Sequence, residues 1–195
     1  ECGTKFVRGM LEDSRPQTFS DLVRISGFSH GTNVWLDNAQ DLIKNGTCKL
    51  NEAISTRDDV MNFLIHRGMD RKHSFFVMEN VRKGKGIEKR NKQGQATTEF
   101  EAEMRENNIP EWFIESCKKI SYLFPRAHAV AYVMMAFRIA WFKVYHPLAF
   151  YAAYFSIRAK AFDLRIMTGD LKTQLTEFNR IKALDRAASP KDKDL

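Results

Sequence analysis

The feature that most constrains the fold is the run of apolar residues that follows Arg126. Its spacing predicts one long helix from Arg126 to about His146, apolar on most of its faces. Such a helix needs other elements to cover it, so we expect it to be the central helix of its domain. The same run carries His128, Arg138 and Lys143, which argues against a membrane span.

Helical signals recur along the rest of the chain, and no segment reads as a convincing strand. Thr18, Thr56 and Asp70 are predicted to cap helices, because each precedes an apolar run with helical spacing. Gly27 is predicted to end the first of these helices. Residues 87–97 have almost no apolar side chains and are predicted to form a mobile loop. The expected fold class is therefore all-α, with many helices.

Spacing also predicts where several side chains lie. In the helix after Asp70, four residues are expected to point inward, namely Phe75, Phe76, Met78 and Val81. The last helix is expected to carry one apolar stripe, formed by Leu171, Leu175, Phe178, Ile181 and Leu184. Further helices are predicted over residues 37–45, 100–107, 110–121, 148–159 and 170–187.

Charge and cysteine content limit the class of protein. The 195 residues carry a net charge of +7, and the pI is about 9.4. This charge favours a polyanionic partner such as nucleic acid, a nucleotide or an acidic membrane surface. Cys2, Cys48 and Cys117 include no CxxC pair, so reduced intracellular thiols are expected rather than a zinc site or disulfides. Both ends look cut from something larger, so we expect a fragment.

The stretch from Tyr122 to Tyr132 gathers an aromatic residue, an arginine, a histidine and a tyrosine at one helix start. Arg126 and His128 fall in the first turn, where free N–H groups and the helix dipole favour an anion. Tyr132 lies four residues after His128, on the same face. A phosphate with a flat ring attached would suit this surface. Alternatively, Arg126 is a surface charge, and His128, Phe124 and Tyr132 are core side chains.

A second basic stretch runs from Arg82 to Gly86. Its two glycines allow a backbone to approach a ligand closely, and Arg82, Lys83 and Lys85 attract phosphate. The spacing is not that of a Walker loop, and no strand precedes it. The alternative is a solvated helix end, where cations are common because they oppose the dipole.

No convincing catalytic or metal-binding constellation appears. Ser29 and His30 are adjacent, but neighbouring residues are not a triad, and no Asp is placed to orient His30. Asp58 and Asp59 look like paired carboxylates, but they stand at a helix start, where capping explains them. We therefore expect no catalytic residue and no metal ligand in this chain.

Several segments together resemble one family. They are Gly3–Arg8, Phe19–Thr32, Asn38–Ile43, Arg57–Met61, Met78–Gly86, Phe100–Arg105, Pro110–Trp112, Ser116–Lys119 and Phe124–Tyr132. The chain resembles the C-family bacterial replicative DNA polymerases, specifically the PolC-type DNA polymerase III alpha subunits of low-GC Gram-positive bacteria. The resemblance extends to about Leu164. It implies a polymerase fingers region over residues 1–164, followed by a truncated helix over 165–195 that leads toward the duplex-binding region.

The resemblance also implies roles for particular residues. In this family the fingers fold over the incoming deoxynucleotide and the templating base. The residues matched to the triphosphate are Arg82, Lys83, Lys85, Arg126 and His128. Those matched to the base and sugar pocket are Phe124, Tyr132, Ser29 and His30.

The family's metal-binding aspartates belong to the palm. The resemblance therefore implies a full-length DNA-directed DNA polymerase that uses Mg²⁺ held outside this chain, and a fragment that is inactive alone. The implied partners are template and primer DNA, dNTP, the palm and thumb of the same polypeptide, and the replisome, in the cytoplasm and without a membrane. Two alternatives stay open: a non-enzymatic basic helical module that binds nucleic acid, and a helical scaffold that binds a protein partner.

Overall fold

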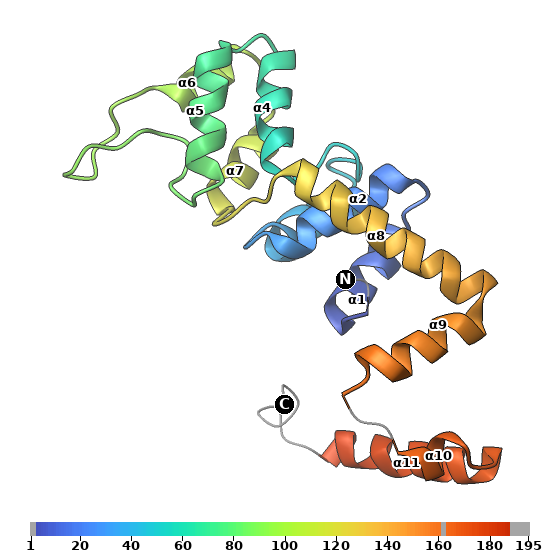
Figure 1. The fold of residues 1–195 in the computed structure, drawn as a ribbon. Helices are drawn as coiled ribbons and strands as arrows, with labels where there is room; N and C mark the ends of the chain where they lie inside the picture. The colour runs from blue at the N-terminus through green and yellow to red at the C-terminus, as the bar shows by residue number, and fades with distance from the viewer. Residues whose placement is uncertain (1–2, 161–162, 188–195) are drawn as a thin grey trace. The chain divides into compact units, whose positions relative to one another are not determined.

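The structure is a computed structural model, which describes residues 3–160 and 163–187 (Figure 1). Within these ranges the chain is all-α, with eleven α-helices, two short π-helical turns and no strand, which confirms the expected class. It divides into two compact units, residues 1–138 and 139–195. The predicted boundary near residue 164 stays a prediction.

The elements of the first unit are α1 (Lys5–Ser14), α2 (Phe19–His30), η1 (Trp35–Ala39), α3 (Gln40–Lys44), α4 (Arg57–His66), α5 (Arg71–Val81), α6 (Phe100–Glu106), α7 (Glu111–Lys119) and the first part of α8 (Arg126–Tyr145). Those of the second unit are the rest of α8, α9 (Pro147–Ala153), η2 (Tyr154–Arg158), α10 (Leu164–Met167) and α11 (Leu171–Ala187).

The predicted caps are present. The Asp21 carboxylate accepts from the Thr18 backbone N–H (2.9 Å), and the Thr18 hydroxyl accepts from Asp21 N–H (3.1 Å). Asp59 likewise accepts from Thr56 N–H at the start of α4 (2.8 Å). Asp70 accepts from two N–H groups in the first turn of α5. These bonds satisfy donors that a helix start leaves without a partner.

The prediction that Gly27 ends a helix is wrong. It lies inside α2, which continues to His30. A Cβ at Gly27 would stand 2.6 Å from the carbonyl oxygen of Ser55. Glycine is needed here because the backbone before α4 packs directly against α2, and not because the helix stops.

Two side chains of α5 also depart from the prediction. Phe75 and Phe76 are 45% and 39% exposed, whereas Met78 and Val81 are buried as expected. The buried stripe of α5 contains Ser74, so the two phenylalanines project beside it.

One helix start differs from the prediction, and one segment predicted as a loop contains no helix. The helix predicted over residues 37–45 begins only at Gln40, because Asp37 has a left-handed φ of 55° and Asn38 is non-helical. Residues 87–97 form no helix and contain one isolated antiparallel bridge between Arg90 and Ala96. Their mobility stays a prediction.

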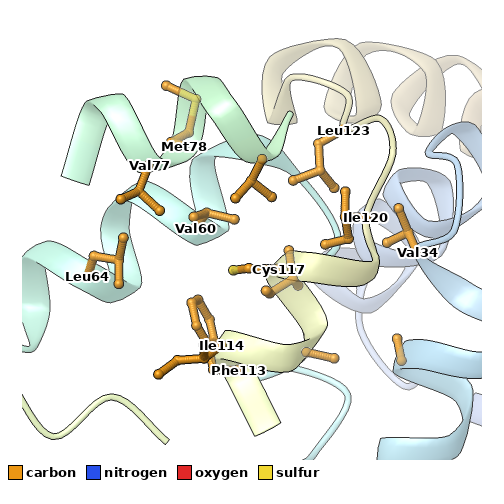
Figure 2. Close-up of a cluster of buried hydrophobic side chains, with 14 of the residues drawn as sticks. Val34, Val60, Leu64, Val77, Met78, Phe113, Ile114, Cys117, Ile120 and Leu123 are labelled. Carbon is orange, nitrogen blue, oxygen red and sulfur yellow. The ribbon is translucent and has the colours of Figure 1, made fainter. Parts of the chain in front are cut away.

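The core of the first unit lies between α4, α5 and α7, and α4 packs along α5 (Figure 2). Its labelled members are Val34, Val60, Leu64, Val77, Met78, Phe113, Ile114, Cys117, Ile120 and Leu123. Burying a large aliphatic or aromatic side chain contributes about 1.5–3 kcal/mol, so this cluster fixes how the three helices meet. Burial raises the pKa of the Cys117 thiol, which therefore stays protonated.

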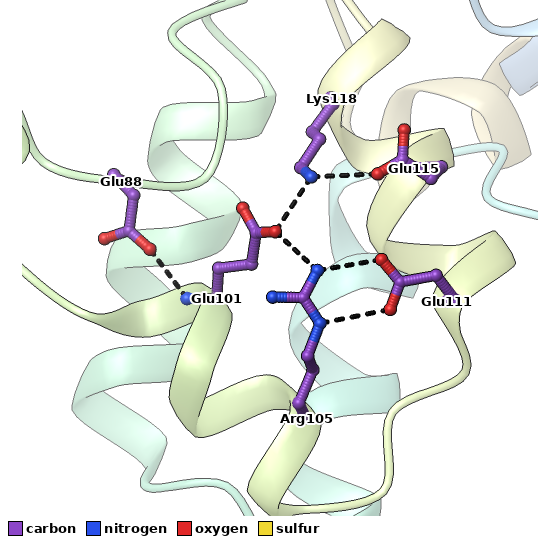
Figure 3. Close-up of polar contacts among 6 residues, drawn as sticks. All are labelled: Glu88, Glu101, Arg105, Glu111, Glu115 and Lys118. Atoms are coloured by element: carbon purple, nitrogen blue, oxygen red, sulfur yellow. Dashed lines mark hydrogen bonds and ion pairs between the residues drawn. The ribbon is translucent and has the colours of Figure 1, made fainter.

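Ion pairs join α6 to α7 on the surface (Figure 3). Arg105 contacts Glu101 (2.7 Å) and Glu111 (2.8 Å), and Lys118 contacts Glu101 and Glu115 (2.8 Å each). The hydrogen bond from Lys118, followed by that from Arg105, lowers the pKa of Glu101. Exposed pairs are individually weak, so the network fixes the register of the two helices more than it stabilises them.

The predicted long apolar helix is present as α8, but most of it is not covered. Ala129 and Val133 are its buried residues, packed against Val23 of α2. Of the helices in the described ranges, α8 alone is long and apolar enough to cross a membrane. Length and composition are weak grounds, since the core helix of a soluble protein passes the same test.

The second unit contains the predicted last helix, α11. Its apolar stripe is exposed along its whole length, at Leu171, Leu175, Phe178, Ile181 and Leu184.

Candidate functional site

The site is organised by the residues between α7 and α8, residues 120–125, which we call the linking segment. Near its start the linking segment pairs with Thr32, two residues after the end of α2. Ser121 N–H donates to the Thr32 carbonyl (3.0 Å), and Thr32 N–H donates to the Tyr122 carbonyl (3.0 Å), an isolated antiparallel bridge. The amide of Asn33 also donates to the Ser121 hydroxyl (2.9 Å). The end of α2 is therefore held against the linking segment.

The linking segment also binds α5 and α4. Leu123 N–H donates to the Arg82 carbonyl at the end of α5 (3.2 Å). The Phe124 carbonyl accepts from Arg57 N–H at the start of α4 (3.0 Å). The basic stretch that begins at Arg82 is thus joined by a backbone hydrogen bond to the segment that leads into Arg126.

Gly84 permits this close approach. Its φ of +67° is in the left-handed region, and a Cβ there would stand 2.5 Å from the Ser121 carbonyl oxygen. Any other residue would be strained at Gly84 and would push the linking segment away.

Four of the predicted site residues form one ring cluster. Phe124 and His128 have ring centroids 4.6 Å apart, and those of His128 and Tyr132 are 4.4 Å apart. His30, from α2, lies 5.4 Å from Phe124 and 6.3 Å from Tyr132. Ser29 lies beside this cluster, because its hydroxyl is 3.0 Å from His30 Nδ1. The structure therefore brings Ser29, His30, Phe124, His128 and Tyr132 together.

Arg82 and Lys83 share one carboxylate. Arg82 contacts Glu79 through Nε and, at 2.9 Å, through a terminal guanidinium nitrogen, and Lys83 Nζ lies 2.9 Å from the same carboxylate. The hydrogen bond from Arg82, followed by that from Lys83, lowers the pKa of Glu79 to about 2. Lys85 is exposed, and its backbone N–H donates to the Asn80 carbonyl (2.9 Å).

Arg126 is paired with Asp59 of α4. The Asp59 side chain is 8% exposed and also lies 3.6 Å from Arg24. Burial raises the pKa of Asp59, but the charge of Arg24, the hydroxyl of Ser55 and the charge of Arg126 outweigh it, so the pKa falls below its usual value.

An anion is expected to bind at the start of α8, and a carboxylate of the protein itself occupies part of this position. Asp58 accepts a 2.7 Å hydrogen bond from the backbone N–H of Arg126. The prediction that these N–H groups are free for a ligand is therefore wrong for Arg126, because a carboxylate from α4 caps the helix. The assignment of Asp59 to capping is confirmed at the start of α4, whereas Asp58 caps α8 and not the helix on which it stands.

The family model described as "Bacterial DNA polymerase III alpha subunit finger domain" matches residues 1–108. The chain belongs to this finger-domain family. The matched range of the finger domain includes Ser29, His30, Arg82 and Lys83, whereas Phe124 and the start of α8 lie beyond it.

Relatives along the whole chain agree with this membership. Proteins named "DNA polymerase III PolC-type" are 55% identical over 100% of this chain in Caldanaerobacter subterraneus subsp. tengcongensis and 53% identical over 100% in Bacillus subtilis. The protein of that name from Thermotoga maritima is 58% identical over 95% of the chain. The chain spans 13% of the length of each of these relatives. The resemblance predicted from the residues is therefore confirmed.

Sequence reasoning missed the carboxylates that hold the cations of this finger domain. Glu79 could have been found, because it stands in the last turn of α5, three and four residues before Arg82 and Lys83. The pairing of Asp59 with Arg126 joins residues 67 positions apart, and no local pattern indicates it.

A cavity of about 400 Å³ lies elsewhere, beside α6, and shares no lining residue with the predicted site. Its lining residues are His73, Thr98, Glu99, Phe100, Ala102, Glu103 and Glu106.

Proposed function

We propose that this chain is the fingers portion of a replicative DNA-directed DNA polymerase, and that it helps to bind the incoming dNTP at the template–primer junction. In this proposal Arg82, Lys83 and Arg126 face the triphosphate, together with Lys85 and His128. Phe124 and Tyr132 flank the base or sugar, beside Ser29 and His30.

The observation that carries the proposal is the linking segment. Its backbone bonds to Arg82 and Thr32 bring the basic stretch after α5 and the end of α2 beside the start of α8. Phosphoryl transfer depends on positioning and charge neutralisation more than on covalent chemistry by the protein. Cations from two segments and a cluster of aromatic rings would supply both for a nucleoside triphosphate.

The alternative is a non-enzymatic helical module that binds nucleic acid through a basic face. Such a module needs only net positive charge. It does not require Arg82 to contact the segment before Arg126. The hydrogen bond between the Arg82 carbonyl and Leu123 N–H favours the nucleotide site.

Metal chemistry would come from outside these residues. The resemblance puts the metal-binding aspartates in the palm, so in this proposal the Mg²⁺ is held by another part of the longer polypeptide and this chain alone is expected to be inactive. Within the described ranges no group of three or more His, Cys, Asp or Glu side chains could hold a metal ion. Its proposed partners are DNA, dNTP, the palm and thumb, and the replisome, in the cytoplasm.

The test replaces single cations in the full-length polymerase. Lys83→Ala and Arg126→Ala should each raise the dNTP KM or lower kcat about fivefold or more, because each removes a charge-assisted contact. Both side chains are over two-fifths exposed. Solvent screening weakens their contacts with phosphate, so we expect a change in KM or kcat near fivefold and not a much larger one.

Matched controls are available in the same chain. Arg138→Ala removes the same charge from an exposed position further along α8, and Lys5→Ala does so on α1. Both should leave KM and kcat near wild type. Unchanged kinetics in Lys83→Ala and Arg126→Ala would count against the assignment.

A further inference from the structure

Glu79 stands where a phosphate group would compete for the same donors. Its carboxylate accepts hydrogen bonds from Nε and from one terminal nitrogen of Arg82, which form one edge of the guanidinium group. The same carboxylate lies 2.9 Å from Lys83 Nζ. A guanidinium binds carboxylate and phosphate through the same fork of N–H groups. A triphosphate that used this edge would therefore have to displace Glu79.

Glu79 and Asp59 are held in different ways. Asp59 is buried and accepts from the Ser55 hydroxyl (2.7 Å) and from the Thr56 backbone (2.8 Å), in addition to its arginine partners. The side chain of Glu79 is 21% exposed, and within the described ranges its side-chain partners are Arg82 and Lys83. Asp59 is thus fixed by the fold, whereas little besides the two cations restrains Glu79.

We infer that Glu79 acts as an internal competitor of the triphosphate for Arg82 and Lys83, and so sets how tightly nucleotide and pyrophosphate are held. This inference rests on the proposed function. The competition is partial, because Arg82 keeps its second edge and Lys83 keeps two further donors. Since the pKa of Glu79 is about 2, its charge is present at every pH at which a polymerase would work.

The competing physical account is that Glu79 orients the two cations for the ligand and stays bound to them. The two accounts predict opposite signs. Removal of a competitor tightens nucleotide binding, whereas removal of an orienting group weakens it because the long side chains regain their freedom.

Glu79→Gln in the full-length polymerase separates the two accounts, because glutamine keeps the shape and an acceptor oxygen but removes the charge. In steady-state incorporation we expect the dNTP KM to fall about three- to tenfold, because the variant loses two partly exposed ion pairs that compete with the nucleotide, and kcat to stay within about twofold of wild type. Inhibition by added pyrophosphate should strengthen by the same factor, since pyrophosphate uses the same donors. An unchanged or raised KM would overturn the inference.

Glu177→Gln is the matched control. Glu177 likewise pairs with an arginine three residues later, Arg180 on α11, through Nε and a terminal nitrogen of its guanidinium group. Loss of this pair should change neither the dNTP KM nor the inhibition by pyrophosphate. If thermal melting shows that Glu79→Gln does not fold, Glu79→Asp is tested instead. The shorter aspartate side chain weakens both ion pairs but keeps the negative charge. A lower KM in that variant supports competition, and an unchanged or raised KM refutes it.

Failure of this inference is distinguishable from failure of the proposed function. If Lys83→Ala raises the KM or lowers kcat but Glu79→Gln does not lower the KM, the nucleotide site stands and the competition does not. If Lys83→Ala, Arg126→Ala and Glu79→Gln all leave both the KM and kcat unchanged, the assignment of the site itself is wrong.

Discussion

The carboxylate of Asp58, in the first turn of α4, accepts a 2.7 Å hydrogen bond from the backbone N–H of Arg126, the first residue of α8. The next residue, Asp59, pairs with the Arg126 side chain. Two consecutive carboxylates therefore hold both the main chain and the side chain of one arginine. The start of α8 is positioned by α4 and not by its own sequence alone.

Replacing Asp58 by Ala should destabilise the chain by about 1 kcal/mol, because it removes a helix cap of ordinary strength. Chemical denaturation measures the change in the free energy of unfolding. Asp58→Asn keeps an acceptor for the Arg126 N–H and should lose less than Asp58→Ala. Equal stability of wild type and Asp58→Ala would show that the hydrogen bond contributes nothing.

Gly84→Ala should be more damaging than Gly86→Ala. Both glycines have a left-handed φ, of +67° and +76°, so each substitution carries backbone strain of about 1 kcal/mol. Only Gly84 faces the Ser121 carbonyl at 2.5 Å, whereas nothing lies within 4 Å of a Cβ at Gly86. Overpacking should add about 1–3 kcal/mol to the cost at Gly84.

The same pair of variants tests the position of the linking segment. In the full-length polymerase, Gly84→Ala should raise the dNTP KM because it displaces the segment that carries Phe124, and Gly86→Ala should leave the KM near wild type. Equal effects of the two variants on stability and KM would mean that the close approach at Ser121 is unimportant.

Local signals predicted the starts of α2, α4 and α5 well. Asp70 caps α5 because an Asp side chain can reach the first free N–H groups, whatever the rest of the chain does. The spacing rule failed at Phe75 and Phe76, because the buried stripe of α5 runs through Ser74, Val77, Met78 and Val81 and the two phenylalanines lie beside it. Gly27 was misread because its close neighbour, Ser55, is distant in sequence.

In the candidate site, too, local sequence indicated the residue types but not the contacts between segments that are distant in the chain. The residue types in Arg82–Lys85 and Phe124–Tyr132 indicated phosphate and ring binding, and the ring cluster of His30, Phe124 and Tyr132 is present in the structure. The hydrogen bond between Leu123 and Arg82 depends on how α5 and α7 pack. No pattern within either segment could indicate it, since packing of distant helices decides which backbone groups meet.

Asp59→Asn should make stability less dependent on pH in acid. The variant leaves Arg24 and Arg126 without a charged partner, and loss of one member of a buried ion pair costs about 3 kcal/mol near neutral pH. In the folded wild type the pKa of Asp59 lies below its ordinary 3.8, although burial alone would raise it, because Arg24, Ser55 and Arg126 favour the charged form.

The sign of the pH dependence follows from this lowered pKa. A carboxyl with a lowered folded pKa contributes stability that is fully present above the unfolded pKa and is lost as pH falls through the folded pKa. The gap between wild type and Asp59→Asn should therefore be largest near neutral pH and shrink below about pH 4. Denaturation curves at several pH values measure the gap, and a constant gap down to pH 2 would contradict the account.

Tyr132→Ala in the full-length polymerase should raise the dNTP KM about fivefold or more, because stacking on an aromatic ring contributes about 1 kcal/mol or more per base. Tyr132→Phe keeps the ring 4.4 Å from His128 and should behave like wild type, since the ring and not the hydroxyl makes the contact. Tyr145→Ala is the control, because Tyr145 is exposed on the same helix and its ring lies 5.2 Å from that of Trp141 instead. If Tyr132→Phe proves as damaging as Tyr132→Ala, the hydroxyl carries the effect and the stacking role assigned to Tyr132 is wrong.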